Sequence, residues 1–297
     1  MRVLPLRKPK IRLSMRLGEM LRQAEKTLVQ AGVDSPRLSA QLIAATVLGT
    51  DRLHCLLETE KELSAAQASE MASLIERRRH GEPVAYLIGK REFYGRDMTV
   101  THDTLIPRPE TEMLVGLALE RMAADAALLF ADLGTGSGCI GVTLALERLK
   151  WKGVLLDISK GSCETAKRNV AEYSLENRLA VLQADLRAAP TASGAFDLVV
   201  SNPPYIGIQE RGEIMDEVWA HEPHTALISE EEGLSHLRSV TQGAARMLSQ
   251  GGRLIVEHGS GQGDAVRSLA AGTGCYTSIE TVRDLAGHDR CMTCVRL

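Results

Sequence analysis

Asp132-Leu133-Gly134-Thr135-Gly136-Ser137-Gly138 is the stretch that decides the fold. It follows an apolar run ending in Asp132 and precedes a segment of helical character, so it predicts a strand, a glycine loop and a helix in succession. Glycines at alternate positions let the backbone approach a ligand closely and turn tightly into the helix. Residues 136–141 also match the pattern Gly-x-Gly-x-x-Gly, which by itself favours a dinucleotide such as NAD. We therefore expect a nucleotide-type ligand at this loop.

Alternating strands and helices follow from Thr111 onward. The pattern predicts a doubly wound α/β sheet with a closing antiparallel strand pair at its edge. Ligands of such sheets bind outside the carboxyl ends of the strands. The predicted strands are 128–132, 153–157, 179–184, 196–201 and 253–257, followed by the closing pair 276–282 and 290–295.

Three acidic residues end consecutive predicted strands: Asp132, Asp157 and Asp185. Each one alone is equally compatible with a helix N-cap. Together they predict a row of acceptors along one crevice. We expect Asp157 to accept hydrogen bonds from ribose hydroxyls, Asp185 to face an exocyclic adenine amine and Leu186 to cover the adenine ring.

Asn202-Pro203-Pro204-Tyr205 directly follows the strand pattern 196–201 and would lie at the same edge of the sheet. Because Asn and Pro are common turn residues, a simple strand-ending turn is one interpretation. The other is a binding site for a planar NH2 group. The Asn202 side chain and the Pro203 main chain supply two carbonyl acceptors for its two donors, and Tyr205 supplies a flat ring for stacking.

The amino-terminal part of the chain has a helical pattern without a glycine-rich loop. Ser64 and Gln67 form a capping-box pattern, while Gly32 and Gly49 supply helix ends. A turn within 93–97 separates two strand-like pieces. The predicted segments are a disordered basic tail at 1–14, a helical domain at 15–82, an extended linker at 83–109 and the α/β domain at 110–297.

Composition limits the classes of protein to consider. With 297 residues and a net charge of −3, the chain is long enough for two domains and is not dominated by nucleic-acid contacts. No apolar run reaches the roughly 18 residues that span a bilayer. Cys291 and Cys294 form a lone pair with no second pair to complete a metal site. We expect a cytoplasmic protein with reduced thiols, no membrane contact and no metal.

The glycine loop resembles the S-adenosylmethionine loop of class I methyltransferases. Together with residues 202–205 it resembles those acting on planar amino or amide nitrogens. Further segments resemble the HemK/PrmC family, the glutamine-N5 methyltransferases of peptide chain release factors, from about Leu17 to the carboxyl terminus. These segments are 83–89, 91–95, 105–112, 222–223, 225–227 and 257–259. Leu186 stands where some members carry Trp, which predicts weaker adenine stacking.

The resemblance implies a class I, Rossmann-like methyltransferase domain with a small amino-terminal helical domain for substrate recognition and a β-hairpin linker. It implies methyl transfer to the Gln of a Gly-Gly-Gln motif in class 1 release factors, with S-adenosylhomocysteine as product. A monomer that needs no nucleic acid directly is expected. The residues implied to contact the cofactor are Gly134, Thr135, Gly136, Ser137, Gly138, Asp157, Asp185, Leu186 and Asn202. Those implied to hold the substrate glutamine are Asn202, Pro203, Pro204 and Tyr205, with Asn202, Pro203 and Tyr205 serving catalysis.

Three other functions are compatible with parts of the sequence. An N6-adenine methyltransferase of DNA or RNA would use the same Asn202 loop, but it would be expected to carry a basic groove or an added recognition domain. An NAD-dependent oxidoreductase would use residues 136–141 and leave the Asn202 loop unexplained. A catalytically silent module would bind the cofactor without transferring a methyl group.

Overall fold

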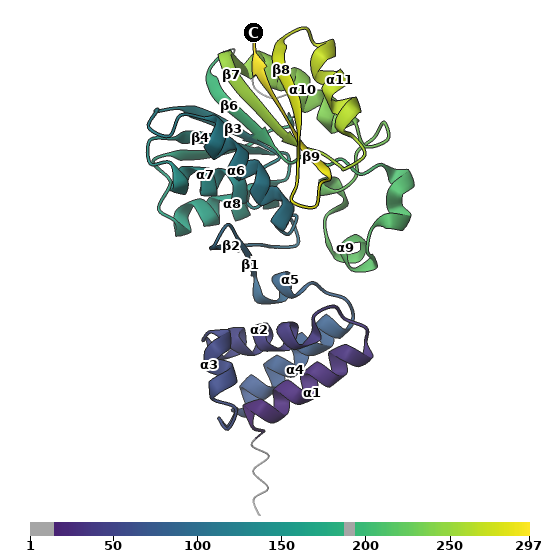
Figure 1. The fold of residues 1–297 in the computed structure, drawn as a ribbon. Coiled ribbons are helices and arrows are strands. Elements are labelled where there is room, and N and C mark those ends of the chain that lie inside the picture. Colours follow the sequence, from purple (N-terminus) through teal and green to yellow (C-terminus); the bar gives the residue numbers. More distant parts are fainter. Residues whose placement is uncertain (1–14, 187–193) are drawn as a thin grey trace, which may run out of the picture. The chain divides into compact units, whose positions relative to one another are not determined.

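The computed structural model describes residues 15–186 and 194–297 (Figure 1). The predicted basic tail, 1–14, lies outside these described residues. The chain divides after Ile88 into two compact units, Met1–Ile88 and Gly89–Leu297. This division falls within the segment 83–109 that the sequence patterns assign to a linker.

The first unit is a group of helices around one apolar core, in which Leu17, Leu28 and Ile43 are fully buried. The predicted capping box is present: the Ser64 hydroxyl accepts from the Gln67 amide, and the Gln67 side chain accepts from the Ser64 amide. Reciprocal capping of this kind satisfies two amides that a helix start leaves without partners. The helices are α1 (Leu17–Gln30), α2 (Pro36–Leu48), α3 (Arg52–Leu57), α4 (Ala65–Arg79) and α5 (Val84–Ile88).

The helix α5 replaces the extended conformation that the sequence predicted for its residues. The Pro83 carbonyl accepts from the amides of Tyr86 and Leu87, which closes one helical turn. Leu87 then packs into the apolar core of the first unit. Burial of this side chain therefore selects a helical turn over the extended form that the neighbouring glycine and proline residues favour.

The second unit begins with the predicted hairpin. β1 (Lys90–Phe93) and β2 (Arg96–Thr99) pair antiparallel. Tyr94 and Gly95 both have positive φ, at 53° and 74°, as a two-residue hairpin turn requires. The Tyr94 amide donates to Glu112 Oε1 at 2.9 Å, and this bond ties the hairpin to the start of the following α/β domain.

A seven-stranded sheet forms the centre of the second unit (Figure 1). Its strands are β3 (Leu129–Leu133), β4 (Lys152–Asp157), β5 (Leu179–Gln183), β6 (Phe196–Ser201), β7 (Leu248–Glu257), β8 (Tyr276–Arg283) and β9 (Asp289–Arg296). The helices are η1 (Pro109–Thr111), α6 (Glu112–Arg121), α7 (Cys139–Glu147), α8 (Lys160–Glu172), η3 (Ile208–Glu213), α9 (Asp216–His221), η4 (His224–Ala226), α10 (Ser235–Met247) and α11 (Gly263–Gly272). All seven predicted strands are confirmed; β7 begins at Leu248, before its predicted start at 253, and the other strands agree to within one residue at each end.

The strand order is β5-β4-β3-β6-β7-β9-β8, and β5 to β7 are parallel. β9 pairs antiparallel with both β7 and β8. The doubly wound fold with an antiparallel strand pair at the edge is therefore confirmed. The order reverses between β3 and β6, which makes the carboxyl ends of these strands the topological switch point where ligands bind.

Both faces of the sheet are covered by helices. On β6, Leu198 and Val200 belong to one apolar cluster with residues of α6 and α7, while Val199 belongs to the cluster with residues of α10 and α11. The same alternation places Cys291 and Cys294 of β9 in opposite clusters, so they do not form a joint metal site. Among the described residues, no helix is long and apolar enough to cross a membrane.

Candidate active site

Four residues paired across neighbouring parallel strands mark the edge of the sheet at which the site lies. Leu156, Leu133, Ser201 and Val256 are paired across β4, β3, β6 and β7. The residues that follow this row are Asp157, Gly134, Asn202 and Glu257. Because parallel strands end at the same edge, the register brings the glycine loop, an acid and the Asn202 loop to one place, as the sequence predicts.

The glycine loop folds back over β4 before α7 begins. The amides of Gly134 and Thr135 both donate to the Leu156 carbonyl, at 2.8 and 2.9 Å. Gly136 and Gly138 have positive φ, at 56° and 83°, a region that residues with a Cβ rarely occupy. Nothing described lies within 4 Å of the position where a Cβ on Gly136 would stand. The loop thus presents bare backbone toward open space.

Asp157 anchors this loop from the end of β4. Its Oδ2 accepts from the Gly136 amide at 2.8 Å, and its Oδ1 accepts from the Ser159 amide at 2.9 Å. Burial raises the pKa of Asp157, and the two amide bonds oppose that shift. Each carboxylate oxygen has a second lone pair, so Asp157 keeps acceptor capacity for two further hydroxyl donors.

Asp132 does not lie along the crevice, which corrects the predicted row of three acceptors. β3 continues for one residue beyond it, and its side chain is fully buried. Its Oδ2 accepts from the Thr135 hydroxyl at 2.6 Å and from the Gly141 amide at 3.1 Å, in the first turn of α7. Burial raises its pKa to about 7. Asp132 therefore supports the glycine loop and the start of α7 from within β3, but it is not the helix N-cap, since Gly138 occupies that position.

The Asn202 loop is held at its base and at its end. The Asn202 Nδ2 atom donates to the Thr111 hydroxyl oxygen at 3.0 Å. The Tyr205 carbonyl accepts from Gln262 Nε2 at 2.8 Å. Ile206 then pairs with Ile228 as an isolated bridge. With two prolines between these anchors, the loop has little freedom to move its carbonyl groups.

Glu257 lies beneath Tyr205. Its Oε1 lies 3.4 Å from the Tyr205 hydroxyl oxygen. The side chain is 99% buried, and burial raises its pKa to about 7, although hydrogen bonding from Thr111 and the charge of Arg290 lower it. Burial and the charge of Glu257 also raise the pKa of Tyr205 well above its usual range. Tyr205 is therefore a neutral phenol near neutral pH.

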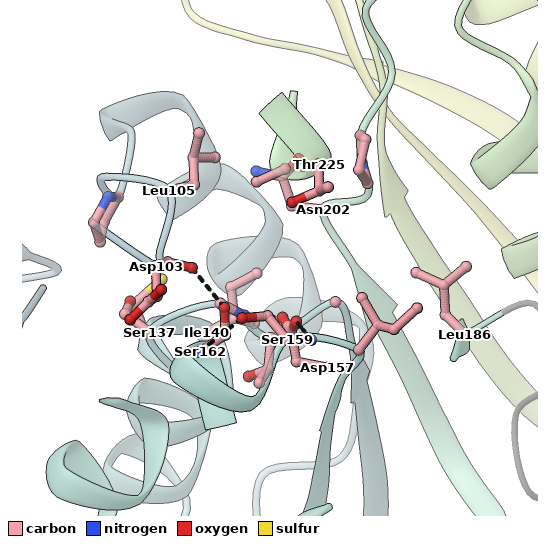
Figure 2. A pocket seen from close by; sticks show the side chains of 18 of the residues that line it. Asp103, Leu105, Ser137, Ile140, Asp157, Ser159, Ser162, Leu186, Asn202 and Thr225 are labelled. Carbon is pink, nitrogen blue, oxygen red and sulfur yellow. Dashed lines mark hydrogen bonds between the residues drawn. The ribbon is translucent and has the colours of Figure 1, made fainter. Parts of the chain in front are cut away.

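Two cavities meet at Asn202. Figure 2 shows the first, with Asn202 and Thr225 on one side and Asp157 and Ser159 on the other. Its lining includes the predicted cofactor residues Gly134, Thr135, Gly136, Ser137, Asp157, Asp185, Leu186 and Asn202, together with Pro204. The second cavity is lined by Asn202, Pro203 and Tyr205. Gly138, also predicted to contact the cofactor, lies outside the lining of either cavity and begins α7.

Several lining residues were not predicted to belong to the site. They include Asp103, Arg108, Thr111, Ser159, Thr225 and His236. Arg108 donates to the buried Glu222 at 2.7 Å, and the other Glu222 oxygen accepts from the Ile106 amide at 3.1 Å. The motif segments 105–112 and 222–227 are thus joined at the site. The sequence signal for this contact was the resemblance of both segments to one family, because Arg108 and Glu222 are 114 positions apart in the chain.

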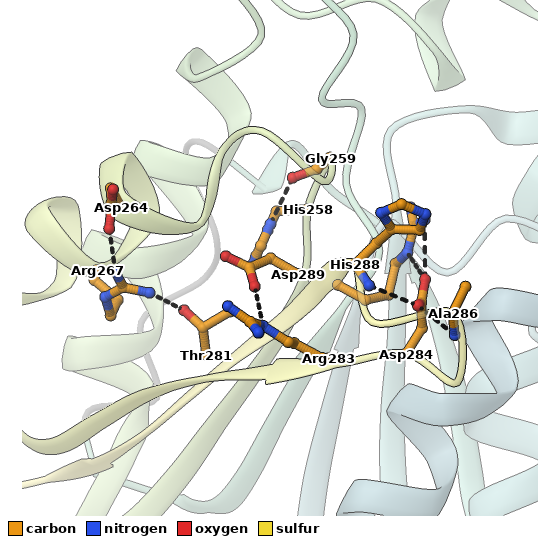
Figure 3. A network of polar contacts seen from close by, with 11 residues as sticks. His258, Gly259, Asp264, Arg267, Thr281, Arg283, Asp284, Ala286, His288 and Asp289 are labelled. Carbon is orange, nitrogen blue, oxygen red and sulfur yellow. Dashed lines mark hydrogen bonds and ion pairs between the residues drawn. The ribbon is translucent and has the colours of Figure 1, made fainter.

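A second polar network lies beside the site, around the turn between β8 and β9 (Figure 3). Asp284 accepts from the amides of Ala286 and His288, both at 3.0 Å, and from Arg290 at 3.3 Å. This arrangement holds Arg290 against the second cavity. The buried His258 points its Nδ1 to the Gly259 carbonyl at 2.8 Å, and burial lowers its pKa. Of the residues in this network, Gly259 and Arg290 line the second cavity.

No group of three or more His, Cys, Asp or Glu side chains within residues 15–186 and 194–297 could hold a metal ion. At the switch point of the parallel sheet, the site combines the backbone cradle of the glycine loop with the Asp157 carboxylate and the Asn202 loop. These features define a class I, Rossmann-like methyltransferase that uses S-adenosylmethionine.

Comparison with known proteins agrees with this class. Residues 19–89 match the family model described as PrmC N-terminal domain, and residues 112–225 match that of the methyltransferase small domain. A release factor glutamine methyltransferase of Nitratidesulfovibrio vulgaris is 40% identical over 92% of this chain and 93% of its own length. One from Vibrio cholerae is 39% identical over 94% and 96%. The chain belongs to this family, the release factor glutamine methyltransferases.

A solved structure shows the same fold at lower similarity. A methyltransferase from Pyrococcus furiosus aligns with a TM-score of 0.50 and 13% identity, covering 76% of this chain and 98% of that chain. At this identity the match concerns the fold alone.

Proposed function

We propose that this protein methylates the side-chain amide nitrogen of the glutamine in the Gly-Gly-Gln motif of class 1 peptide chain release factors. The observation that carries the proposal is the position of Asn202 at the meeting point of two cavities. One cavity is lined by the glycine loop and Asp157, and the other by Pro203 and Tyr205. A donor and an acceptor molecule that entered from opposite sides would meet at the Asn202 amide.

The first cavity fits S-adenosylmethionine. The bare backbone at Gly136 leaves room for close approach, and the remaining acceptor capacity of Asp157 suits two ribose hydroxyls. Asp185 and Leu186 would face the adenine. When bound, the cofactor supplies a methyl group that is already electrophilic because it sits on a sulfonium, and S-adenosylhomocysteine would remain. We propose no metal for this reaction.

The second cavity would position the substrate amide. An amide nitrogen is a poor nucleophile, because its lone pair is delocalised into the carbonyl group. The Asn202 Oδ1 and the Pro203 carbonyl would accept its two N–H bonds, and the Tyr205 ring would hold its plane. Such alignment supplies roughly 7–11 kcal/mol in favourable cases. The two acceptors also stabilise positive charge as it develops on the nitrogen. The proton then leaves to water, without a dedicated base.

The helical unit would recognise the release factor outside its Gly-Gly-Gln motif. We propose that the protein acts in the cytoplasm as a monomer and requires no direct contact with nucleic acid. The net charge of −3 agrees with a protein substrate, since nucleic-acid binding is dominated by contacts of Lys and Arg with phosphates.

The test is methyl transfer to a purified class 1 release factor, read by mass spectrometry of the peptide that contains the motif. We expect one added CH2 on its glutamine, and none in a factor whose motif glutamine is replaced by glutamate. Asn202→Ala should abolish transfer and leave S-adenosylmethionine binding largely intact. Asn177→Ala, at an exposed asparagine, is the matched control and should change neither.

Two results would contradict the proposal. Methyl transfer to DNA or RNA without transfer to any release factor would favour an N6-adenine methyltransferase. Equal loss of cofactor binding and transfer in Asn202→Ala would place Asn202 in the cofactor site alone.

A further inference from the structure

A β-turn after strand β7 lines the second cavity, and its central residues have no role in the mechanism above. The turn comprises residues 259–262, and all four line the cavity. It is closed by two bonds: the Gln262 amide donates to the Gly259 carbonyl, and the Gly259 amide donates to Gln262 Oε1, both at 2.9 Å. The amides of Ser260 and Gly261 donate to no group within the described part of the chain, and both residues are exposed. The turn thus brings two unused donors to the cavity wall.

The turn is fixed next to the Asn202 loop. Gln262 Nε2 donates to the Tyr205 carbonyl at 2.8 Å, so one side chain bonds both the turn and the loop. A Cβ built on Gly259 would lie 3.6 Å from Tyr205 Cδ2, which is ordinary van der Waals contact. The turn therefore lies against the ring that would hold the substrate amide. A main chain that places its glutamine side chain at this ring passes close to the turn.

The backbone of the turn is open to a close approach. No described atom lies within 4 Å of the position that a Cβ on Gly261 would take, and its φ lies outside the left-handed region. Amides without a partner on such a backbone match the carbonyl oxygens of another main chain. That main chain can come close only where it also lacks side chains, as it does at two consecutive glycines.

We propose that the turn 259–262 binds the main chain of the two glycines that precede the substrate glutamine, with the amides of Ser260 and Gly261 donating to its carbonyl oxygens. These two residues determine specificity through their backbone, and Gln262 is a positioning residue that keeps the turn at Tyr205. The inference rests on the proposed function and extends it, because it assigns a part of the protein to the Gly-Gly of the motif. A side chain on either glycine would hold the two main chains apart.

Ser260→Pro and Ser260→Ala form a pair that isolates one amide. Both variants lose the hydroxyl group, and only the proline also lacks the N–H. Proline is favoured at the second position of a type I turn, and the φ of Ser260 is not positive, so the turn can accept it. Relative to Ser260→Ala, Ser260→Pro should raise the KM for a purified class 1 release factor about 3- to 10-fold, the effect of one lost hydrogen bond. The Kd for S-adenosylmethionine should be equal in both, since the turn lies outside the lining of the first cavity.

Gly261→Ala tests the close approach. The added methyl group meets no described atom within 4 Å, so the variant should fold, and its kcat/KM should fall about 10-fold. Gly272→Ala, at the other end of α11 and equally without neighbours, is the matched control and should leave kcat/KM unchanged. With a release factor whose second motif glycine is replaced by alanine, Gly261→Ala should have a smaller effect. Equal factors with both substrates would overturn the inference, as would equal KM values for Ser260→Pro and Ser260→Ala.

A spectroscopic readout separates this inference from the proposed function. In 15N-labelled protein with S-adenosylhomocysteine, the amides of Ser260 and Gly261, assigned through Ser260→Pro and Gly261→Ala, should become protected from exchange when the release factor is added. The Gly272 amide should not change. Methyl transfer without this protection would overturn the inference and leave the proposed function in place. Absence of transfer together with unchanged amide signals would refute the proposed function and the inference with it.

Discussion

Asp157→Asn tests the assignment of the cofactor cavity. In the wild-type protein the two carboxylate oxygens accept from the Gly136 and Ser159 amides at 2.8 and 2.9 Å, and each oxygen retains one lone pair. An asparagine offers one oxygen, so its NH2 group must face one of the two amides as donor against donor. The variant thus loses one anchoring bond of the loop and part of its acceptor capacity for ribose.

The expected loss is mainly one of affinity. Hydrogen bonds to a charged acceptor contribute about 1.5–3 kcal/mol. Losing one such bond to a ribose hydroxyl therefore weakens S-adenosylmethionine binding roughly 10- to 150-fold, at about 1.4 kcal/mol for each tenfold change. Burial raises the pKa of Asp157, so removing its charge offsets part of the cost of the lost loop bond. We expect the free energy of unfolding to change by less than about 2 kcal/mol.

Isothermal titration calorimetry with S-adenosylmethionine measures the affinity, and urea unfolding measures stability. Asp125→Asn is the control, because Asp125 is exposed and the charge change is the same. An Asp157→Asn affinity within twofold of the wild type would refute the role of Asp157 in holding the cofactor. A loss of affinity that appears only together with unfolding would show that Asp157 serves the fold alone.

Three further predictions concern stability. Burial raises the pKa of the Glu257 carboxyl from 4.5 to about 7, so the native state keeps this proton to a higher pH than the unfolded state does. The free energy of unfolding should therefore fall by up to ~3 kcal/mol as the pH rises from about 4.5 to 7. In urea unfolding across this pH range, Glu257→Gln should show a flatter profile than the wild type. Gly153→Ala should lower the free energy of unfolding by about 1–3 kcal/mol, because the added Cβ would overlap the ring of Phe130 on the neighbouring strand. An unchanged urea midpoint would contradict this packing. Gly138→Ala should lower the free energy of unfolding by at least about 1–2 kcal/mol in the same assay, since the φ of Gly138 is +83° and the added Cβ would lie 3.2 Å from the Cβ of Ala166. An unchanged free energy of unfolding would mean that the glycine loop can relax.

The strands of the α/β domain could be predicted because local rules and global topology agree there. Each strand is a short apolar run bounded by turn residues, and parallel strands must end at a common edge. The one error among the strand-end acids came from a shift of one residue. β3 continues to Leu133, so Asp132 remains inside the sheet and faces the start of α7. Apolar periodicity does not locate a strand end to within one residue, although one residue decides which way a side chain points.

The contacts that support Asn202 could not be predicted from spacing. The bond between Asn202 and Thr111 spans 91 positions, and the one between Arg108 and Glu222 spans 114. Such contacts depend on how the loops before α6 and after β6 fold over the sheet edge. Helix α5 was missed for a related reason, because burial of Leu87 decides its conformation. Local sequence signals carry little information on contacts between distant segments or on the burial of a single side chain.

The arrangement of these supports favours positioning as the main source of catalysis. The Asn202 loop is fixed from three separate elements: Thr111 of η1 holds its first side chain, Glu257 at the end of β7 lies beneath its tyrosine, and Gln262 holds its last carbonyl at 2.8 Å. A reaction that relied on a titrating base would need a group with a suitable pKa facing the substrate. Tyr205 has its pKa raised far above neutrality, and Glu257 is buried behind it. In the proposed function, a rigid pair of acceptors would supply what an amide nitrogen requires, because orientation of the nitrogen and stabilisation of its developing charge would both follow from where two carbonyl groups point.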